Sequence, residues 1–175
     1  MIGYAAFLLF AATIPAANWL IGNVGTNCIP NGPCLIPVGF GLDAPSGVLM
    51  VGATLVLRDI LHERLGAAWA LAAIMVGGIL SWWVAAPTLV LASVLAFTLS
   101  ELADFAVYAP LRKRRLAFAV LASGIMGSVI DSAVFLWLAF GSLAFIEGQI
   151  VGKIWMSAAA FIVLTAMRRK ETGAP

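Results

Sequence analysis

Charged side chains are scarce in this chain. Only 10% of its 175 residues are Asp, Glu, Lys or Arg, whereas 63% are hydrophobic. A soluble domain carries about 25% charged and about 45–50% apolar residues, and a soluble fold of this size could not bury so much apolar surface. The composition therefore excludes a water-soluble enzyme, a disordered chain and a nucleic-acid-binding protein, and it predicts an integral membrane protein.

Residues that commonly carry catalysis or bind metals are also few. His62 is the only histidine, and Cys28 and Cys34 are the only cysteines. The sequence contains no His-Glu-x-x-His zinc motif, no Gly-x-Ser-x-Gly nucleophile turn and no phosphate-binding P-loop. These absences disfavour an enzyme and imply no cofactor, and an ATP-driven mechanism would need a separate subunit.

Long hydrophobic runs are what the sequence has instead of charge. One crossing of a bilayer takes about 20 residues, so the chain has room for six crossings and short connections. Pro87 suits a helix start. We therefore expect an all-α integral membrane protein with six transmembrane helices in one bundle. The predicted spans are residues 2–21, 44–57, 67–84, 87–108, 116–140 and 150–167.

The few basic residues orient these spans. Nine of the ten Lys and Arg residues lie between spans two and three, between spans four and five, or after span six. The other connections have none, and the positive-inside rule then predicts that both termini lie in the cytoplasm. Residues 22–43 form an external loop in this topology. There, Cys28 and Cys34 could form a disulfide or stay two free thiols.

Four charged residues fall within the predicted spans. Glu101 and Asp104 share one helix face on span four, Asp131 lies midway along span five, and Lys153 lies near the outer end of span six. An ionisable residue at membrane depth costs a few kcal/mol unless it is paired or faces water. One interpretation is structural, with Asp131 paired to Lys153 and Asp104 to Arg112. The other, which the surplus of acids favours, is a polar cavity that contacts a solute or a proton.

The polar residues also form a recognisable pattern. Span four reads Ser-Glu-Leu-Ala-Asp-Phe-Ala-Val-Tyr at residues 100–108, and span five reads Val-Ile-Asp-Ser-Ala-Val-Phe at residues 129–135. Span one carries the pair Asn18-Trp19, and span six carries Lys153. In these features the chain resembles the bacterial vitamin uptake transporter family, whose known members are queuosine precursor transporters.

This resemblance implies import of a 7-deazaguanine base such as 7-cyano-7-deazaguanine. A carboxylate can accept two adjacent N–H groups of a guanine-like edge, and a flat base packs on aromatic side chains. Trp19, Phe105 and Tyr108 are candidates for such aromatic walls. The principal candidate substrate-binding residues are Asn18, Arg58, Glu101, Asp104, Asp131, Ser132, Phe135 and Lys153.

More than one function is compatible with this pattern. The first is a secondary transporter for a purine-like solute, embedded in the lipid bilayer, with no nucleic-acid partner and with self-association left open. The second is the substrate-binding subunit of an energy-coupling vitamin importer, which is also a six-helix protein. Such a subunit would dock through small residues, for which Ala12 and Ala16 are candidates. An intramembrane enzyme is the least favoured alternative.

Overall fold

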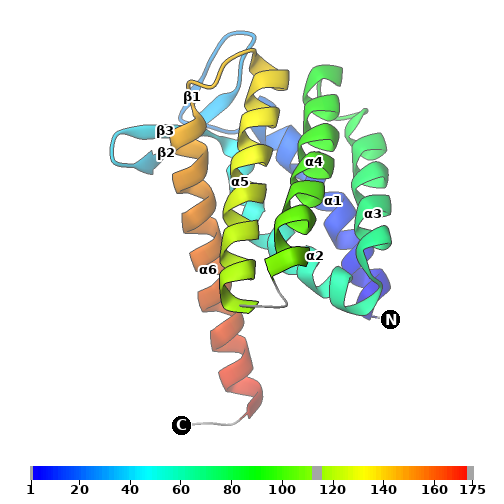
Figure 1. Cartoon of the computed structure of the whole chain (residues 1–175). Coiled ribbons are helices and arrows are strands. Elements are labelled where there is room, and N and C mark those ends of the chain that lie inside the picture. The colour runs from blue at the N-terminus through cyan, green and yellow to red at the C-terminus, as the bar shows by residue number, and fades with distance from the viewer. Residues whose placement is uncertain (1, 112–115, 173–175) are drawn as a thin grey trace.

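The computed structural model describes residues 2–111 and 116–172, which are mainly helical. Each hydrophobic run contains one α-helix, and Figure 1 shows the helices gathered in a bundle. Pro87 begins the fourth helix. The helices are α1 (Ile2–Asn23), α2 (Val51–Arg64), α3 (Ala67–Ser81), α4 (Pro87–Leu111), α5 (Leu116–Phe140) and α6 (Ile146–Thr172).

The segment between α1 and α2 corrects the expectation of an all-α fold. Strands β1 (Asn27–Cys28), β2 (Cys34–Gly39) and β3 (Leu42–Pro45) pair antiparallel in a three-stranded sheet. The Gly-, Pro- and Asn-rich composition had predicted only a loop here. In the structure Cys28 and Cys34 form a disulfide that joins β1 to β2. The segment between α1 and α2 is therefore a small folded element rather than a free loop.

The second hydrophobic run is not one continuous helix. It begins at the end of β3, continues through the short 3₁₀ helix η1 (Ser46–Met50), and only then becomes α2. Gly47 lets η1 pack closely on α1, because a Cβ at this position would lie 2.7 Å from Cδ1 of Ile21. At its other end α2 extends to Arg64, beyond the predicted span. The turn of backbone at η1 thus lies against the outer half of α1.

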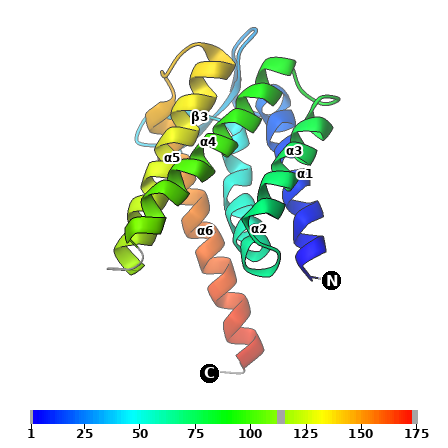
Figure 2. The ribbon, with the colours of Figure 1, turned by 45° about the vertical axis from the view of Figure 1, so that its right-hand side comes forward.

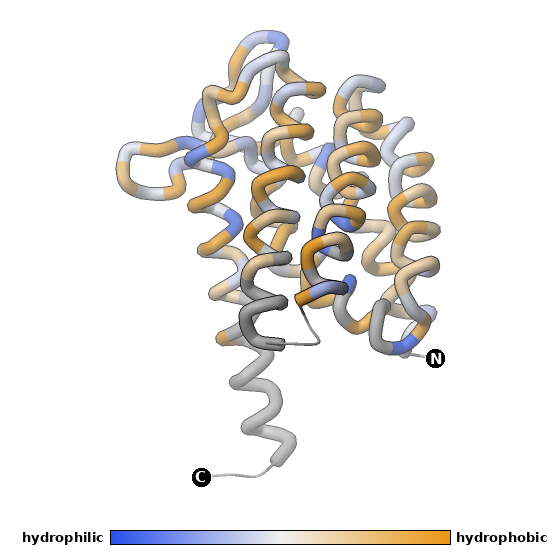
Figure 3. The backbone as a smooth tube through the Cα atoms, viewed as in Figure 1, coloured by the Kyte–Doolittle hydropathy of each residue, from blue (hydrophilic) through white to orange (hydrophobic). Residues whose placement is uncertain are grey.

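The two ends of the bundle differ in what they carry. The start of α1, the end of α4, the start of α5, the end of α6 and the α2–α3 connection lie at one end. The sheet lies at the other end with the α3–α4 and α5–α6 connections (Figures 1 and 2). Hydrophobic residues cover much of the helices between these ends (Figure 3). In the described chain, Gly3–Asn23 and Pro87–Asp104 are long and apolar enough to cross a bilayer, and the apolar parts of other helices are shorter.

Two clusters of buried apolar side chains hold the helices together. The first joins α1, α2 and α3, with Phe10, Leu61 and Ile74 among its members. The second joins α1, α4 and α5, and it includes Ile21 and Leu136. The second cluster borders the polar cavity described next.

Candidate functional site

A cavity of about 60 Å³ lies where α1, η1, α2, α4, α5 and α6 meet. A water molecule occupies about 30 Å³ of liquid, so the cavity is large enough for about two waters. Its apolar walls include Phe97 and Phe135. Its polar side chains come from four different helices, and they are Asn18, Ser93, Asp131, Gln149 and Lys153.

Lys153 is the centre of the polar lining. Its Nζ donates hydrogen bonds to Asp131 Oδ2 at 2.5 Å, to Ser132 Oγ at 2.6 Å and to the Ser128 carbonyl oxygen at 3.4 Å. These three acceptors match the three donors of an ammonium group. The structural interpretation of Asp131 and Lys153 as a pair is therefore confirmed, and the same pair also lines the cavity.

Asn18 connects three helices on the opposite side of the cavity. Its side chain is 2% exposed. Ser93 Oγ donates to Asn18 Oδ1 at 2.7 Å, and Asn18 Nδ2 donates to Ser81 Oγ at 3.3 Å. A buried carboxamide that is bonded at both ends holds a fixed orientation. The sequence analysis missed Ser81 and Ser93, because a single serine in an apolar helix has no distinguishing pattern.

Gln149 is a second residue of the cavity that the sequence analysis missed. It lies before the predicted start of span six, but α6 begins earlier, at Ile146. Its side chain is 6% exposed, and its Oε1 is buried without a hydrogen-bond partner. The cavity therefore contains a polar group that the described residues leave unsatisfied.

Two glycines determine which face of α6 lies toward the cavity. A Cβ at Gly148 would overlap the carbonyl oxygen of Asp43 in β3, and a Cβ at Gly152 would lie 2.9 Å from Cγ2 of Val48 in η1. The glycines are four residues apart and so lie on one helix face. Each is followed directly by a cavity residue. Close packing of the glycine face therefore turns the neighbouring polar face toward the cavity.

A second polar group lies nearer the end of the bundle at which α2 ends with Arg64, here called the basic end. Arg58 Nη1 of α2 donates to Glu101 Oε1 of α4 at 2.8 Å, and the two side chains are 27% and 14% exposed. Neither side chain lines the cavity, and Glu101 lies one turn beyond the cavity residue Phe97, a rise of about 6 Å along α4. The structure thus separates Arg58 and Glu101 from the Asp131–Lys153 pair.

Asp104 lies one turn further along α4, against α5. A Cβ at Gly127 would be 3.6 Å from the Asp104 Cβ. Asp104 forms no hydrogen bond or ion pair with another residue of the described ranges. Its suggested partner, Arg112, lies outside these ranges.

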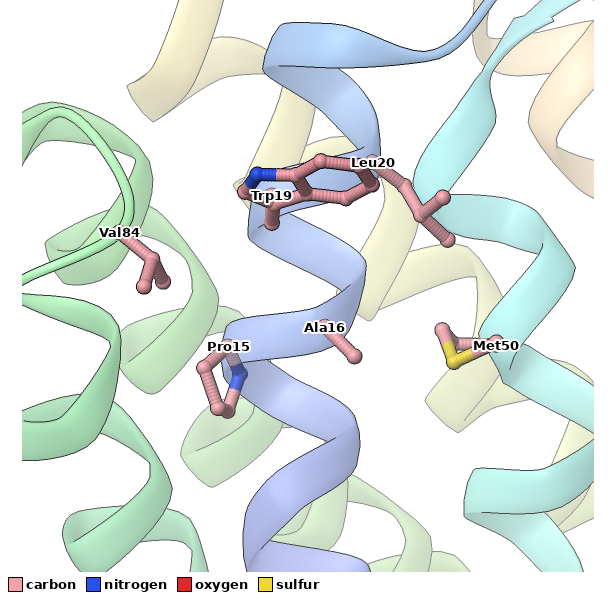
Figure 4. Close-up of a pocket in the computed structure, with 6 residues that line it drawn as sticks. All are labelled: Pro15, Ala16, Trp19, Leu20, Met50 and Val84. Carbon is pink, nitrogen blue, oxygen red and sulfur yellow. The ribbon is translucent and has the colours of Figure 1, made fainter.

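The aromatic candidates divide between two environments. Phe135 lines the cavity and packs edge to face on Phe140, with the ring centroids 5.8 Å apart. Trp19 is 47% exposed and lies instead in an apolar groove of about 390 Å³ beside Pro15 and Met50 (Figure 4). The side chains of Phe105 and Tyr108 lie outside the described part of the structure. Phe135 is therefore the predicted aromatic residue that contributes to the polar cavity.

The cavity places an ion pair inside an apolar helical bundle. Ionisable residues inside an apolar helical bundle pair with each other or face a cavity that serves a solute or ion pathway. Among the side chains that the structure describes, no three His, Cys, Asp or Glu approach closely enough to hold a metal ion. The cavity thus offers hydrogen bonds and one ion pair as its binding chemistry.

Comparison with known families gives the class of protein. The family described as "Putative vitamin uptake transporter" matches residues 81–168. The match covers about half of the chain, including α4, α5 and most of α6, and the protein belongs to this family. Comparisons with curated proteins and with solved structures found no significant match. The chain is therefore a membrane protein of a transporter family.

Proposed function

We propose that this protein is a secondary transporter that imports a queuosine precursor, a 7-deazaguanine base such as 7-cyano-7-deazaguanine. Membership of the vitamin uptake transporter family supports import of a small organic solute. The observation that carries the proposal is the cavity, in which hydrogen-bond donors and acceptors from four helices converge beside Phe97 and Phe135.

The cavity suits the edges of a guanine-type base. Such a base presents N–H donors on its ring and amino group, and it presents a carbonyl acceptor. Asp131 can accept from the exocyclic amino group, and Lys153 can donate to a carbonyl or nitrile acceptor. Phe135 can pack against the flat ring. Asp131 would give up Lys153 as its partner when the base binds, and the two charges neutralise each other until then.

The cavity must enlarge to admit this substrate. At about 60 Å³ it is well below the roughly 300 Å³ at which small-molecule pockets begin. The helices around the cavity must therefore move apart before the base can enter. The Arg58–Glu101 pair then bridges α2 and α4 between the cavity and the basic end of the bundle. Release to that side would require this pair to separate.

The proposed topology has six crossings, with both termini in the cytoplasm of a bacterial inner membrane. Arg64 ends α2 at the end of the bundle where α1 begins and α6 finishes (Figure 1). This gathering of a basic connection and both helix ends on one side supports the orientation. The shorter apolar helices would cross by tilting or by locally thinning the bilayer.

Uptake of labelled 7-cyano-7-deazaguanine tests the function. Cells that can neither make nor import this base should accumulate the label when they express the protein, and excess unlabelled base should suppress it. An empty vector and the Asp131→Asn variant are the controls, and both should fail to accumulate label. Absence of uptake, together with absence of binding to the purified protein, would exclude the proposed substrate.

One observation favours the alternative of a substrate-binding subunit. Ala5 and Ala12 are exposed on α1, and Ala16 lines the apolar groove on the same helix. Small residues let another helix approach closely, so this face could dock a membrane partner. Cells without any energy-coupling ATPase discriminate the two functions, because a secondary transporter stays active there and a binding subunit does not.

A further inference from the structure

The buried carboxamide of Gln149 has no structural explanation within the described bundle. Its Oε1 is the one buried side-chain polar atom of the described residues that lacks a hydrogen-bond partner. Leaving such a group unsatisfied costs about 1–3 kcal/mol. An apolar residue of similar size would avoid this cost. The position therefore carries a destabilising group that a ligand could satisfy.

The surroundings of Gln149 direct this carboxamide toward a ligand. It lines the cavity, and Gly148 beside it packs against the β3 backbone, which fixes the rotation of α6. Lys153 lies one turn further along the same helix, at a rise of about 6 Å. A bicyclic base placed in the enlarged cavity could thus contact both residues at once.

The other polar side chains of the cavity either already have hydrogen-bond partners or can only accept hydrogen bonds. Asn18 is hydrogen-bonded through both its oxygen and its nitrogen, and the ammonium of Lys153 has three acceptors. Asp131, when ionised, can only accept. Among the cavity residues that the structure describes, Gln149 is the one that offers an open acceptor next to an amide donor.

We propose that Gln149 is a specificity-determining residue that binds the lactam edge of the substrate, and this inference rests on the proposed function. Its Oε1 accepts the hydrogen bond of the ring N–H, and its Nε2 donates to the adjacent exocyclic oxygen. This pairing satisfies the buried carboxamide and selects bases in which a donor and an acceptor stand side by side. Bases without the exocyclic oxygen also lack the proton on the adjacent ring nitrogen, so both groups of the carboxamide lose the partners that the lactam edge gives them.

Binding to the purified full-length protein tests the inference. The probes are 7-cyano-7-deazaguanine and its analogue without the 6-oxo group, and the variants are Gln149→Leu and Gln149→Glu. A bidentate amide pair is worth about 1–3 kcal/mol, so each variant should bind the first probe roughly 10- to 100-fold more weakly. The Gln149→Glu variant loses affinity because its second carboxylate oxygen replaces the amide donor and faces the exocyclic oxygen of the substrate.

Two further measurements separate recognition from a structural role. Wild-type protein should prefer the 6-oxo base, whereas Gln149→Leu should bind both probes equally and weakly. The same leucine variant should unfold at the same or a higher temperature, because it removes an unsatisfied buried amide. Ile154→Leu, on the exposed face of α6, is the matched control and should bind like the wild type.

The outcomes are distinguishable. If the wild type binds neither probe, the proposed function fails and the inference fails with it. If the wild type binds the 6-oxo base and both Gln149 variants bind it within twofold, only the inference is overturned. A leucine variant that unfolds at a lower temperature and keeps the preference for the 6-oxo base would also overturn it, because Gln149 would then act in packing.

Discussion

The Asp131–Lys153 pair provides the sharpest test of whether the cavity is a functional site. The pair links α5 to α6, so it could serve only to lock two helices. Asp131→Asn and Lys153→Met each remove one charge with little change in side-chain size. The double variant removes both. A purely structural pair and a substrate-binding pair predict different results for this double variant.

The expected magnitudes follow from burial. The side chains of Asp131 and Lys153 are 21% and 11% exposed, and leaving one partner of a buried pair uncompensated costs about 3–5 kcal/mol. Asp131→Asn should lower the free energy of unfolding by about 3 kcal/mol, because Lys153 keeps Ser132 and the Ser128 carbonyl as acceptors. Lys153→Met should lower the free energy of unfolding by about 5 kcal/mol, because Asp131 has no other hydrogen-bond donor in the described structure.

The double variant should recover most of this loss. It buries no charge, so its free energy of unfolding should lie within about 1 kcal/mol of the wild-type value. Titration with denaturing detergent measures this quantity for all four proteins. The coupling energy between the two positions should exceed about 3 kcal/mol. Single variants as stable as the wild type would refute the burial argument.

Uptake measured on the same proteins decides the role. If the pair binds substrate, the double variant should fold normally and accumulate label at least tenfold more slowly than the wild type. Asp131 and Lys153 would then act in binding as well as in packing. A stable double variant that transports at the wild-type rate would remove both residues from the proposed site.

Three other regions yield predictions. Glu101→Gln should slow uptake yet preserve binding of the base, since Glu101 does not line the cavity and lies one turn, about 6 Å, beyond the cavity residue Phe97 on α4; lost binding would contradict this placement. Gly148→Ala should lower the free energy of unfolding by about 1–3 kcal/mol through overpacking and abolish uptake. Gly124→Ala, which enters open space, should show neither effect in the same assays. Replacing Cys28 and Cys34 by serine should cost about 2 kcal/mol, from the entropy of a short closed loop, and leave uptake unchanged; a reductant titration of the wild type checks the stability change.

The helices were predictable because hydropathy is a local property. Each hydrophobic run contains a helix, and the proline at residue 87 begins α4. The three-stranded sheet was not predictable in the same way. Its strands pair residues up to ten positions apart, such as Leu35 with Pro45, and its composition is that of a loop. Strand pairing of this kind depends on register and on packing against α6, which no single segment encodes.

The candidate site was predictable only where charge revealed it. Asp131 and Lys153 were identifiable because ionisable residues are costly in an apolar bundle. Ser93 and Gln149 carry no charge, and only the three-dimensional arrangement brings them to the same cavity. Glu101 was identified by the same cost, but the structure pairs it with Arg58 outside the cavity. Charge therefore identified interior residues without showing which of them share a site.

The packing of α6 connects the size of the cavity to the ion pair. The sequence from Gly148 to Lys153 places a glycine and then a polar residue twice, four residues apart. The glycines contact β3 and η1, and Gln149 and Lys153 face the cavity. A displacement of α6 away from α5 would enlarge the cavity, and it would also separate Lys153 from Asp131. We infer that admission of substrate and opening of the ion pair are one event, in which the substrate replaces the hydrogen bonds that Asp131 gives up.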